Sequence, residues 1–364
     1  MDASTPETAK PRVVFITRKW GPAVGGMETY CERLAEELAK IQPVDVIALK
    51  GRDNGQPPSV LALLSFPFIV IGRLIAMATD RASQKPEIVH LGDMAIWPLA
   101  LMARLFFPSA RIVLSAHGTD VAYGARGGLK GSAYAAFLSL GARLLSKARV
   151  IANSRATRDR LLSINWNSDA VVPLATDLRS DPADEIDTDR IVFAGRLVRR
   201  KGLHWFVSNV LPLLPETARI TVIGTRWDET ENAALNHQQV EFLGPKPQAE
   251  LAQYFAKAAC VIVPNIEIEN GEYEGFGLVA PEAASAGGVV LAAASGGLRD
   301  AVIDCETGFQ LPAGDAQAWA KKIAEIASWS ETDRAAFVSR STAKAQEHYS
   351  WSRVAADTSA AYSD

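Results

Sequence analysis

Short apolar runs rich in β-branched residues alternate with segments of helical spacing through the first half of the chain. The first run covers residues 12–17, and a glycine-rich loop separates it from residues 27–41, whose apolar side chains recur three and four positions apart. Further strand runs follow at 44–49, 88–91, 112–115 and 150–152. Strands that alternate with helices pair in parallel, so this half predicts a doubly wound sheet.

A polar, acidic stretch at 177–189 interrupts the alternation, and the same pattern then starts again. Strand runs are predicted at 190–194, 220–223, 240–243, 260–263 and 288–292, and the segment 349–362 has helical spacing. A chain of 364 residues exceeds the size at which one hydrophobic core usually stops growing. We expect an α/β fold of two Rossmann-like domains facing a cleft, 1–180 and 181–346, with a helix at 347–364 that returns to the first domain.

The most apolar stretch of the chain covers residues 59–78. Pro67 and Arg73 interrupt it, and about 20 residues leave no margin for crossing a bilayer. We therefore predict a helix buried in the first domain. The alternative is a surface that faces the acceptor or lies on a membrane.

Composition and charge indicate a globular protein. Hydrophobic residues make up 48% and charged residues 22%, which excludes fibrous and disordered classes. The net charge of −3 hides an asymmetry, because residues 1–180 hold 22 basic and 15 acidic residues while 181–364 hold 16 and 26. A basic first half fits an anionic acceptor or surface, and ordinary scatter of surface charge explains it equally well. We expect no nucleic-acid partner.

The cysteines and the first residues of the chain indicate the cellular compartment of the protein. Cys31, Cys260 and Cys305 are widely spaced and form no C-x-x-C pattern, which argues against a disulfide framework and a zinc site. Residues 1–11 are polar and lack the apolar core of a signal peptide. A cytoplasmic protein is expected.

The segment 274–282, EGFGLVAPE, carries the densest chemical signal. If a helix begins near Leu278, the backbone N–H groups from Phe276 onward are unpaired donors at its positive end, where a diphosphate can bind. Gly275 and Gly277 permit close approach of that group. This loop is therefore a candidate phosphate site.

Two carboxylates flank this glycine turn, Glu274 and Glu282. Carboxylates accept hydrogen bonds from hydroxyl pairs, so Glu274 is expected beside a sugar and Glu282 beside a ribose. The alternative is that Glu282 only favours a helix N-terminus and Glu274 is a solvated loop charge.

The segment 194–202, AGRLVRRKG, follows a predicted strand and places two cations at the mouth of the sheet. Arg196 and Lys201 would neutralise the charge that grows on a diphosphate leaving group. Alone, such cations usually belong to a solvated loop, and their pairing with the glutamate motif favours a functional role.

The first half offers weaker signals. Gly25 and Gly26 lie in the first strand-to-helix loop, where a phosphate could approach, although the loop is not a G-x-G-x-x-G fingerprint. His117, in the segment SAHGTD, ends a predicted strand and could donate to a sugar hydroxyl or phosphate oxygen. A capping or buried histidine is the alternative.

Metal binding is not expected. The D-x-D triplet at 187–189 falls before a strand instead of at its carboxyl end, so we interpret it as solvated. Cations then take the place of a metal at the phosphates.

In their order and spacing, these segments resemble glycosyltransferase family 4, the retaining glycosyl transferases group 1 with the GT-B fold. Further segments are similar to the family's landmarks: 152–162, 172–177, 240–244, 295–302, 308–315 and 349–351. There are departures at Leu174, Asn265 and Arg299, and the acidic segment 267–272 is unusual and leaves the donor sugar open.

The resemblance implies roles only where residues match. Glu274 would bind the donor sugar hydroxyls, Glu282 the ribose, and Arg196 with Lys201 the phosphates. The remaining matches are the backbone and cleft positions Gly25, Gly26, Gly275, Phe276, Gly277, Leu278 and His117. His117, Glu274, Arg196 and Lys201 would be catalytic.

The resemblance also implies a metal-independent, retaining transfer from a UDP- or GDP-linked sugar to a hydroxyl of a glycan, glycolipid or small molecule. The nucleotide sugar is the substrate, and no cofactor is expected. The acceptor can be lipid-linked, which leaves peripheral association with the inner face of the membrane open. Rival interpretations are a GT-B nucleotide-sugar epimerase or phosphorylase, and a non-catalytic sugar-nucleotide-binding protein.

Overall fold

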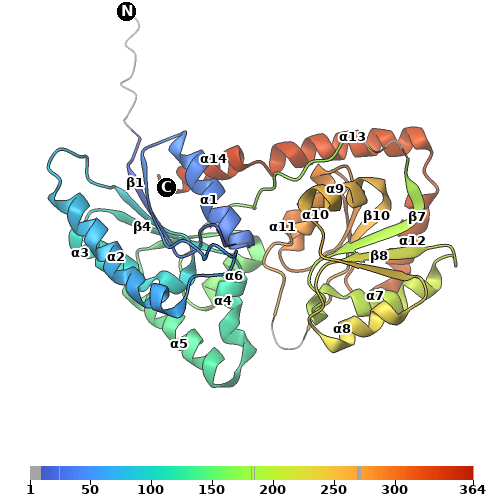
Figure 1. Cartoon of the computed structure of the whole chain (residues 1–364), viewed down its shortest axis with the longest axis horizontal. Coiled ribbons are helices and arrows are strands. Elements are labelled where there is room, and N and C mark those ends of the chain that lie inside the picture. Colours follow the sequence, from blue (N-terminus) through green and yellow to red (C-terminus); the bar gives the residue numbers. More distant parts are fainter. Residues whose placement is uncertain (1–9, 24, 182, 184, 269–271, 364) are drawn as a thin grey trace, which may run out of the picture.

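The fold consists of two parallel six-stranded sheets, each covered by helices (Figure 1). It is known from a computed structural model, which describes residues 10–23, 25–181, 183, 185–268 and 272–363. Part of the acidic segment 267–272 and most of the polar start at 1–11 therefore lie outside the described residues. The two sheets are of the Rossmann type that the alternating pattern predicts.

The first sheet has the order β2-β1-β3-β4-β5-β6. Its strands are β1 (Val13–Thr17), β2 (Val44–Ala48), β3 (Ile88–Leu91), β4 (Arg111–Ala116), β5 (Arg149–Ala152) and β6 (Ala170–Val171). Its helices are α1 (Gly26–Ala39), α2 (Val60–Thr79), α3 (Pro98–Phe106), α4 (Thr119–Ala122), α5 (Gly128–Leu144) and α6 (Arg155–Ser163), with short 3-10 turns at Met94–Ile96 and Tyr123–Arg126. The two-residue strand β6 was not predicted, because so short a run has no period of its own.

The second sheet has the order β12-β11-β10-β7-β8-β9. Its strands are β7 (Asp187–Ala194), β8 (Arg219–Ile223), β9 (Val240–Gly244), β10 (Ala258–Val263), β11 (Val290–Ala293) and β12 (Phe309–Leu311). Its helices are α7 (Leu203–Asn209), α8 (Glu229–Ala233), α9 (Gln248–Lys257), α10 (Val279–Ser285), α11 (Leu298–Ala301) and α12 (Ala316–Ala327), with 3-10 turns at Arg199–Lys201, Leu211–Leu213 and Ala234–Asn236. Strand β7 begins three residues earlier than predicted, and β12 was missed.

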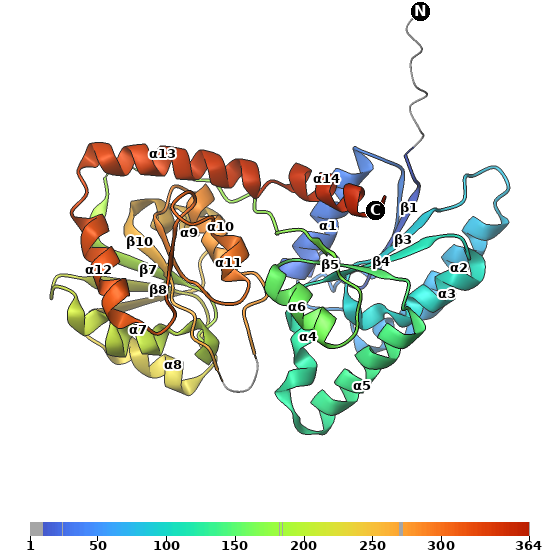
Figure 2. The ribbon, with the colours of Figure 1, turned by 180° about the vertical axis from the view of Figure 1, so that it is seen from behind.

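Alternate residues of each strand serve different layers. In β1, Val13 and Phe15 face α1, whereas Val14 and Ile16 pack with the buried side chains of α2, α3 and α5. This period of two is what a strand buried on both faces requires. The layers are visible in Figure 2, where α1 and α14 cover one face and α2, α3 and α5 the other.

The two last helices connect the domains. Helix α13 (Glu331–His348) runs along the second domain, and α14 (Trp351–Ala361) packs against α1 of the first (Figure 1). A buried polar chain holds this end in place, because His90 Nδ1 lies 2.7 Å from the Tyr362 hydroxyl and His90 Nε2 lies 2.8 Å from Ser115 Oγ. Burial lowers the pKa of His90 to about 3, so this imidazole is neutral.

One prediction about the first domain is wrong. The apolar segment 59–78 does form a helix, α2, but only Phe66, Val70 and Leu74 are buried in it. Its opposite side is also apolar and is exposed to solvent. A sequence that is apolar all round predicts burial on all sides, and here the domain covers one side only.

Candidate active site

The loops that follow β7 and β10 meet because these strands are neighbours in the second sheet. The loop after β7 ends in the 3-10 turn that contains Lys201, and the loop after β10 carries Asn265 and Glu274. Lys201 Nζ lies 2.6 Å from Glu274 Oε2, and Asn265 Nδ2 donates to the same oxygen at 3.1 Å. Two residues predicted from separate motifs thus form one ion pair.

The environment of Glu274 keeps its carboxylate charged. Burial acts to raise its pKa, but the charges of Lys201 and Arg200 and the hydrogen bonds from Lys201 and Asn265 outweigh burial, and the net pKa is lowered. Arg200, which was not predicted, lies 3.8 Å from Glu274 Oε2. The signal for it was present in the run of three cations at 199–201.

Glu282 has the opposite electrostatics. It lies in the first turn of α10, and burial raises its pKa to about 7 although the charge of Lys201 acts to lower it. Within the described part of the chain, no ion pair or hydrogen bond involves its carboxylate. The two glutamates are therefore different groups: Glu274 is paired and ionised, and Glu282 is unpaired and titrates near neutral pH.

Arg196 lies apart from this pair. It follows β7 after Gly195, its side chain is exposed, and its guanidinium lies over the Trp227 ring at 5.7 Å from the ring centroid. Among the described residues it makes no ion pair. The structure thus brings Lys201, but not Arg196, into direct contact with Glu274.

The glycine turn after Glu274 is packed against the first domain. A Cβ atom on Gly275 would lie 2.5 Å from the His117 carbonyl oxygen, and one on Gly118 would lie 2.5 Å from Gly275 Cα. Gly277 has φ of 92°, a value that only glycine adopts without strain. Gly118 and Gly275 permit contact between the two domains at this point.

The rest of the predicted loop lies beside that contact. Phe276 is buried, and its ring contacts Tyr349 with centroids 6.3 Å apart. Leu278 precedes α10, which begins at Val279, close to the predicted start. The loop is thus held by the hydrophobic core beneath it.

Gly25 and Gly26 begin α1 on the first-domain side of the junction. No side chain caps this helix end, and a Cβ atom on Gly26 would lie 3.6 Å from Leu278 Cδ1. The unpaired N–H groups at the start of a 14-residue helix therefore lie next to the loop that carries Glu274. The structure brings these two predicted phosphate-facing segments together.

His117 follows β4 and is buried. Its Nε2 atom lies 2.9 Å from the Gly92 carbonyl oxygen and must donate to it, because a carbonyl only accepts. The Tyr30 ring packs against the imidazole edge at a centroid distance of 4.6 Å. The donor that was expected to serve a substrate is thus engaged, and in the neutral ring Nδ1 remains as an acceptor.

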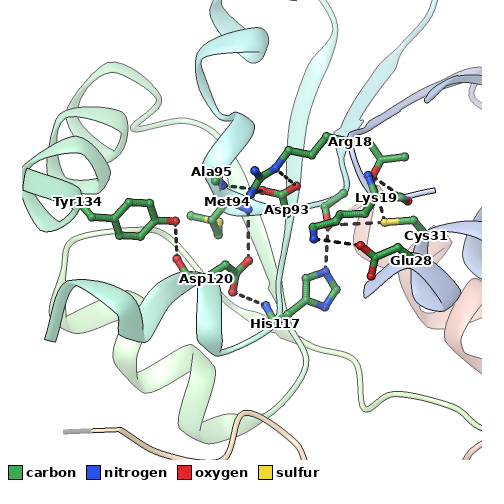
Figure 3. Close-up of polar contacts among 12 residues, drawn as sticks. Arg18, Lys19, Glu28, Cys31, Asp93, Met94, Ala95, His117, Asp120 and Tyr134 are labelled. Atoms are coloured by element: carbon green, nitrogen blue, oxygen red, sulfur yellow. Dashed lines mark hydrogen bonds and ion pairs between the residues drawn. The ribbon is translucent and has the colours of Figure 1, made fainter. Parts of the chain in front are cut away.

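Sequence reasoning missed a set of charged residues around His117 (Figure 3). Arg18 Nε pairs with Asp93 Oδ2 at 3.1 Å, and Lys19 Nζ pairs with Glu28 Oε1 at 3.0 Å. Asp120 Oδ1 accepts the His117 backbone N–H at 2.9 Å. Arg18, Asp93 and Asp120 follow the ends of β1, β3 and β4, and that common position was the available signal.

An ion pair also links the domains away from the glycines. Arg155 Nε lies 2.7 Å from Asp300 Oδ1, and the Arg155 backbone N–H donates to Asp300 Oδ2 at 2.9 Å. Helix α6 of the first domain is thereby attached to α11 of the second.

Within the described residues, no group of three or more His, Cys, Asp or Glu side chains could hold a metal ion. The D-x-D triplet was expected before a strand and solvated, but it forms the amino end of β7, where Asp187 pairs with Arg190 and Arg219. That end of the sheet is opposite to the loops of the candidate site.

Comparisons with known proteins agree with this geometry. Residues 24–179 match the model of Glycosyltransferase Family 4, and residues 188–328 match that of Glycosyl transferases group 1. The two matches follow one another and together cover most of the chain. The chain belongs to glycosyltransferase family 4, the glycosyl transferases group 1.

Among curated relatives, this family member is similar to D-inositol 3-phosphate glycosyltransferases. The protein of Xylanimonas cellulosilytica is 33% identical over 192 residues, which cover 50% of this chain and 43% of the relative. That of Corynebacterium aurimucosum is 26% identical over 244 residues, covering 59% and 56%. The alignments span about half the length of these relatives.

Solved structures show the same fold over nearly the whole chain. Sucrose-phosphate synthase from Thermosynechococcus elongatus superimposes with a TM-score of 0.69 at 20% identity, covering 97% of this chain and 98% of that one. HepE from Anabaena, solved in complex with UDP and glucose, gives a TM-score of 0.66 at 18% identity, covering 97% and 100%.

Proposed function

We propose that this family member is a metal-independent, retaining glycosyltransferase that moves a sugar from a nucleotide-diphosphate donor to an acceptor hydroxyl. The observation that carries the proposal is the grouping of Lys201, Glu274 and Glu282 beside the uncapped start of α1. A cation, an ionised carboxylate and free backbone donors are the groups that a diphosphate sugar requires. HepE, which shares the fold, was solved with UDP and with UDP-glucose, which supports a nucleotide-sugar donor here.

In the proposed donor complex, each group serves one part of the donor. Lys201 has three N–H donors and uses one on Glu274, so two remain for the diphosphate. Glu274 accepts hydrogen bonds from the sugar hydroxyls, and Glu282 accepts those of the ribose. Arg196 is exposed beside Trp227, where it can contact the phosphates without breaking an ion pair seen in the described residues.

In the proposed reaction, the acceptor oxygen bonds to the anomeric carbon on the face from which the diphosphate leaves. The bond between that carbon and the phosphate oxygen breaks, and the departing phosphate takes the proton of the acceptor. Negative charge grows on the diphosphate, where Lys201, Arg196 and the N-terminus of α1 stabilise it. His117 Nδ1 accepts a hydrogen bond from a substrate hydroxyl and orients it.

The acceptor is a glycan, a lipid-linked saccharide or a small molecule, and we place the reaction in the cytoplasm. The three cysteines are free, as is usual in a reducing compartment. The curated relatives are named for inositol 3-phosphate, but the chain aligns with only about half of each. Because the relatives are similar over that part, inositol 3-phosphate is the first acceptor to test.

The proposal is tested by incubating the protein with UDP- and GDP-sugars and inositol 3-phosphate, glycan or polyprenyl-linked acceptors, followed by NMR of the anomeric proton. The expected product keeps the anomeric configuration of the donor, with equal rates before and after EDTA treatment. An inverted product would contradict the retaining mechanism. Activity that EDTA removes and Mg²⁺ or Mn²⁺ restores would contradict metal independence.

A further inference from the structure

Helix α2 presents an apolar stripe to solvent along its whole length. Leu61, Leu64, Phe68 and Ile75 lie on the exposed side, with exposed fractions of 76%, 66%, 75% and 45%. Their spacing of three, four and seven residues keeps them on one side of the helix. We call the surface formed by these four side chains the α2 stripe. Leu61 and Ile75 lie 14 residues apart, so at a rise of 1.5 Å per residue this stripe is about 21 Å long.

The other side of α2 belongs to the domain core. Phe66, Val70 and Leu74 are buried among the side chains of β1, β3 and α3, and α2 itself forms the connection from β2 to β3. Among the described helices, α2 is long and apolar enough to cross a membrane, and 17% of its most apolar stretch is buried. Crossing would remove the three core side chains from the sheet, so this helix can lie on a membrane without leaving its domain.

Helices α3 and α5 extend the exposed apolar surface. Leu105 at the end of α3 is 81% exposed, and Leu144 at the end of α5 is also exposed. Helix α3 packs directly on α2, and Arg104 Nη1 reaches the Leu144 carbonyl oxygen at 3.4 Å. Figures 1 and 2 show the three helices together on one flank, opposite α1 and α14.

Positive charges predominate on this flank, although Asp80 directly follows α2. Helices α2, α3 and α5 contain no Asp or Glu, and their charged residues are Arg73, Arg104, Lys130 and Arg143. Beside Arg104 lies a cavity of about 680 Å³ whose described lining includes Arg111, Lys147 and Arg149 and no acidic residue. An apolar stripe on a flank with a net positive charge fits a partner that is apolar inside and anionic at its surface.

This charge pattern selects among the partners that could cover an apolar surface. In a twofold dimer the surface would contact itself and place cations against cations, which opposes association. A bilayer with anionic headgroups instead offers acyl chains to the α2 stripe and negative charge to Arg104 and the cations beside it. We propose that the first domain docks on anionic membranes through the α2 stripe, with α2 lying parallel to the surface.

The test uses the full chain with vesicles of phosphatidylcholine, with and without phosphatidylglycerol, in a co-flotation assay. We expect binding to the anionic vesicles that weakens as salt is added. Leu64→Gln combined with Phe68→Gln should lower the binding constant for anionic vesicles on the order of tenfold. Leu213→Gln, at an exposed leucine of the second domain, is the matched control and should bind like the unaltered protein.

Charge is tested separately with Arg104→Gln, which should weaken binding to anionic vesicles about fivefold. Arg340→Gln removes an exposed arginine of α13 and should have no effect. Absence of binding by the unaltered protein overturns the proposal, as does equal binding by the Leu64 and Phe68 double variant. A dimer that forms without lipid and dissociates in that variant overturns it in favour of a second copy. UDP binding by calorimetry should be unchanged in every variant, which separates this proposal from that of the active site.

Discussion

The two sheet edges that meet at the domain junction use their charged residues differently. On the second domain, Glu282 has no partner among the described residues and Lys201 keeps two N–H donors after pairing with Glu274. On the first domain, Arg18 and Lys19 are each paired with a buried carboxylate, and His117 donates to a backbone carbonyl. Groups that keep free donors or acceptors after pairing, such as Lys201, can also bind a ligand, whereas the pair of Arg18 with the fully buried Asp93 holds its loops in shape. We therefore expect substitutions of Lys201, Glu274 and Glu282 to change binding and turnover, and those of Arg18 and Asp93 to change stability.

Among the substitutions that test this comparison, Lys201→Ala is expected to have the largest effect, which is on turnover. If Lys201 stabilises the leaving diphosphate, the fall in kcat/KM should correspond to a loss of about 2 to 4 kcal/mol of transition-state stabilisation. Arg199→Ala is the matched control, because Arg199 is an exposed cation of the same 3-10 turn. Steady-state kinetics at saturating acceptor measure both variants, and equal loss in the two would show that Lys201 has no particular role.

The two glutamates should respond differently. Glu282→Ala should weaken binding of both the free nucleoside diphosphate and the nucleotide sugar by about 1 to 3 kcal/mol, since both contain the ribose. Glu274→Ala should leave the affinity for the free diphosphate nearly unchanged and strongly reduce turnover, because it orients the sugar. Calorimetry with both ligands distinguishes these outcomes, and the reverse pattern would show that the donor lies in the opposite orientation.

On the first edge, Asp93→Asn should lower the free energy of unfolding by about 2 kcal/mol, because it removes the charge that balances Arg18. The Asp93 side chain is fully buried, whereas Glu36 pairs with Arg33 on the surface. Glu36→Gln is therefore the control, with an expected change of about 0.5 kcal/mol or less. Urea denaturation measures both. A loss of UDP affinity in Asp93→Asn without a loss of stability would contradict the conclusion that Asp93 only holds its loop in place.

The smallest effect is expected in the pH dependence of donor binding. Burial raises the pKa of Glu282 from its usual 4.5 to about 7, so its contribution to stability is complete below about pH 4.5 and is lost as the pH rises through 7. The ionised form accepts hydrogen bonds from the ribose more strongly, so nucleotide-sugar affinity should rise through this range by up to about 1 kcal/mol.

Glu282→Gln should remove this rise. Calorimetry between pH 6 and pH 8 is best made with a nucleotide sugar, because its diphosphate diester does not titrate there. Ligand affinity is a better readout than stability, since burial also raises the pKa of Glu231 to about 7. If the nucleotide-sugar affinity still rises with pH in Glu282→Gln, another titrating group causes the rise.

Much of the fold and part of the site follow from local sequence patterns. Buried parallel strands such as β3 appear as short apolar runs, and β3 was predicted with its observed bounds. Glu274 and Lys201 were predicted as site residues because each belongs to a short motif with a specific chemistry, and the structure brings them into contact. The strand β6 and the residues Arg18 and Asp93 were missed, because no local pattern distinguishes them from ordinary loop residues.

The sequence by itself determined most of the segments that become strands and helices, since the period of apolar residues depends only on neighbouring positions. It also determined which residue types the loop at 274–282 carries. Only the tertiary structure decided that Lys201 pairs with Glu274, that His117 donates to Gly92, and that one apolar side of α2 stays uncovered. Pairing and burial depend on which distant segments meet, and a strand order such as β10-β7-β8 brings together loops that lie more than 60 positions apart in the chain.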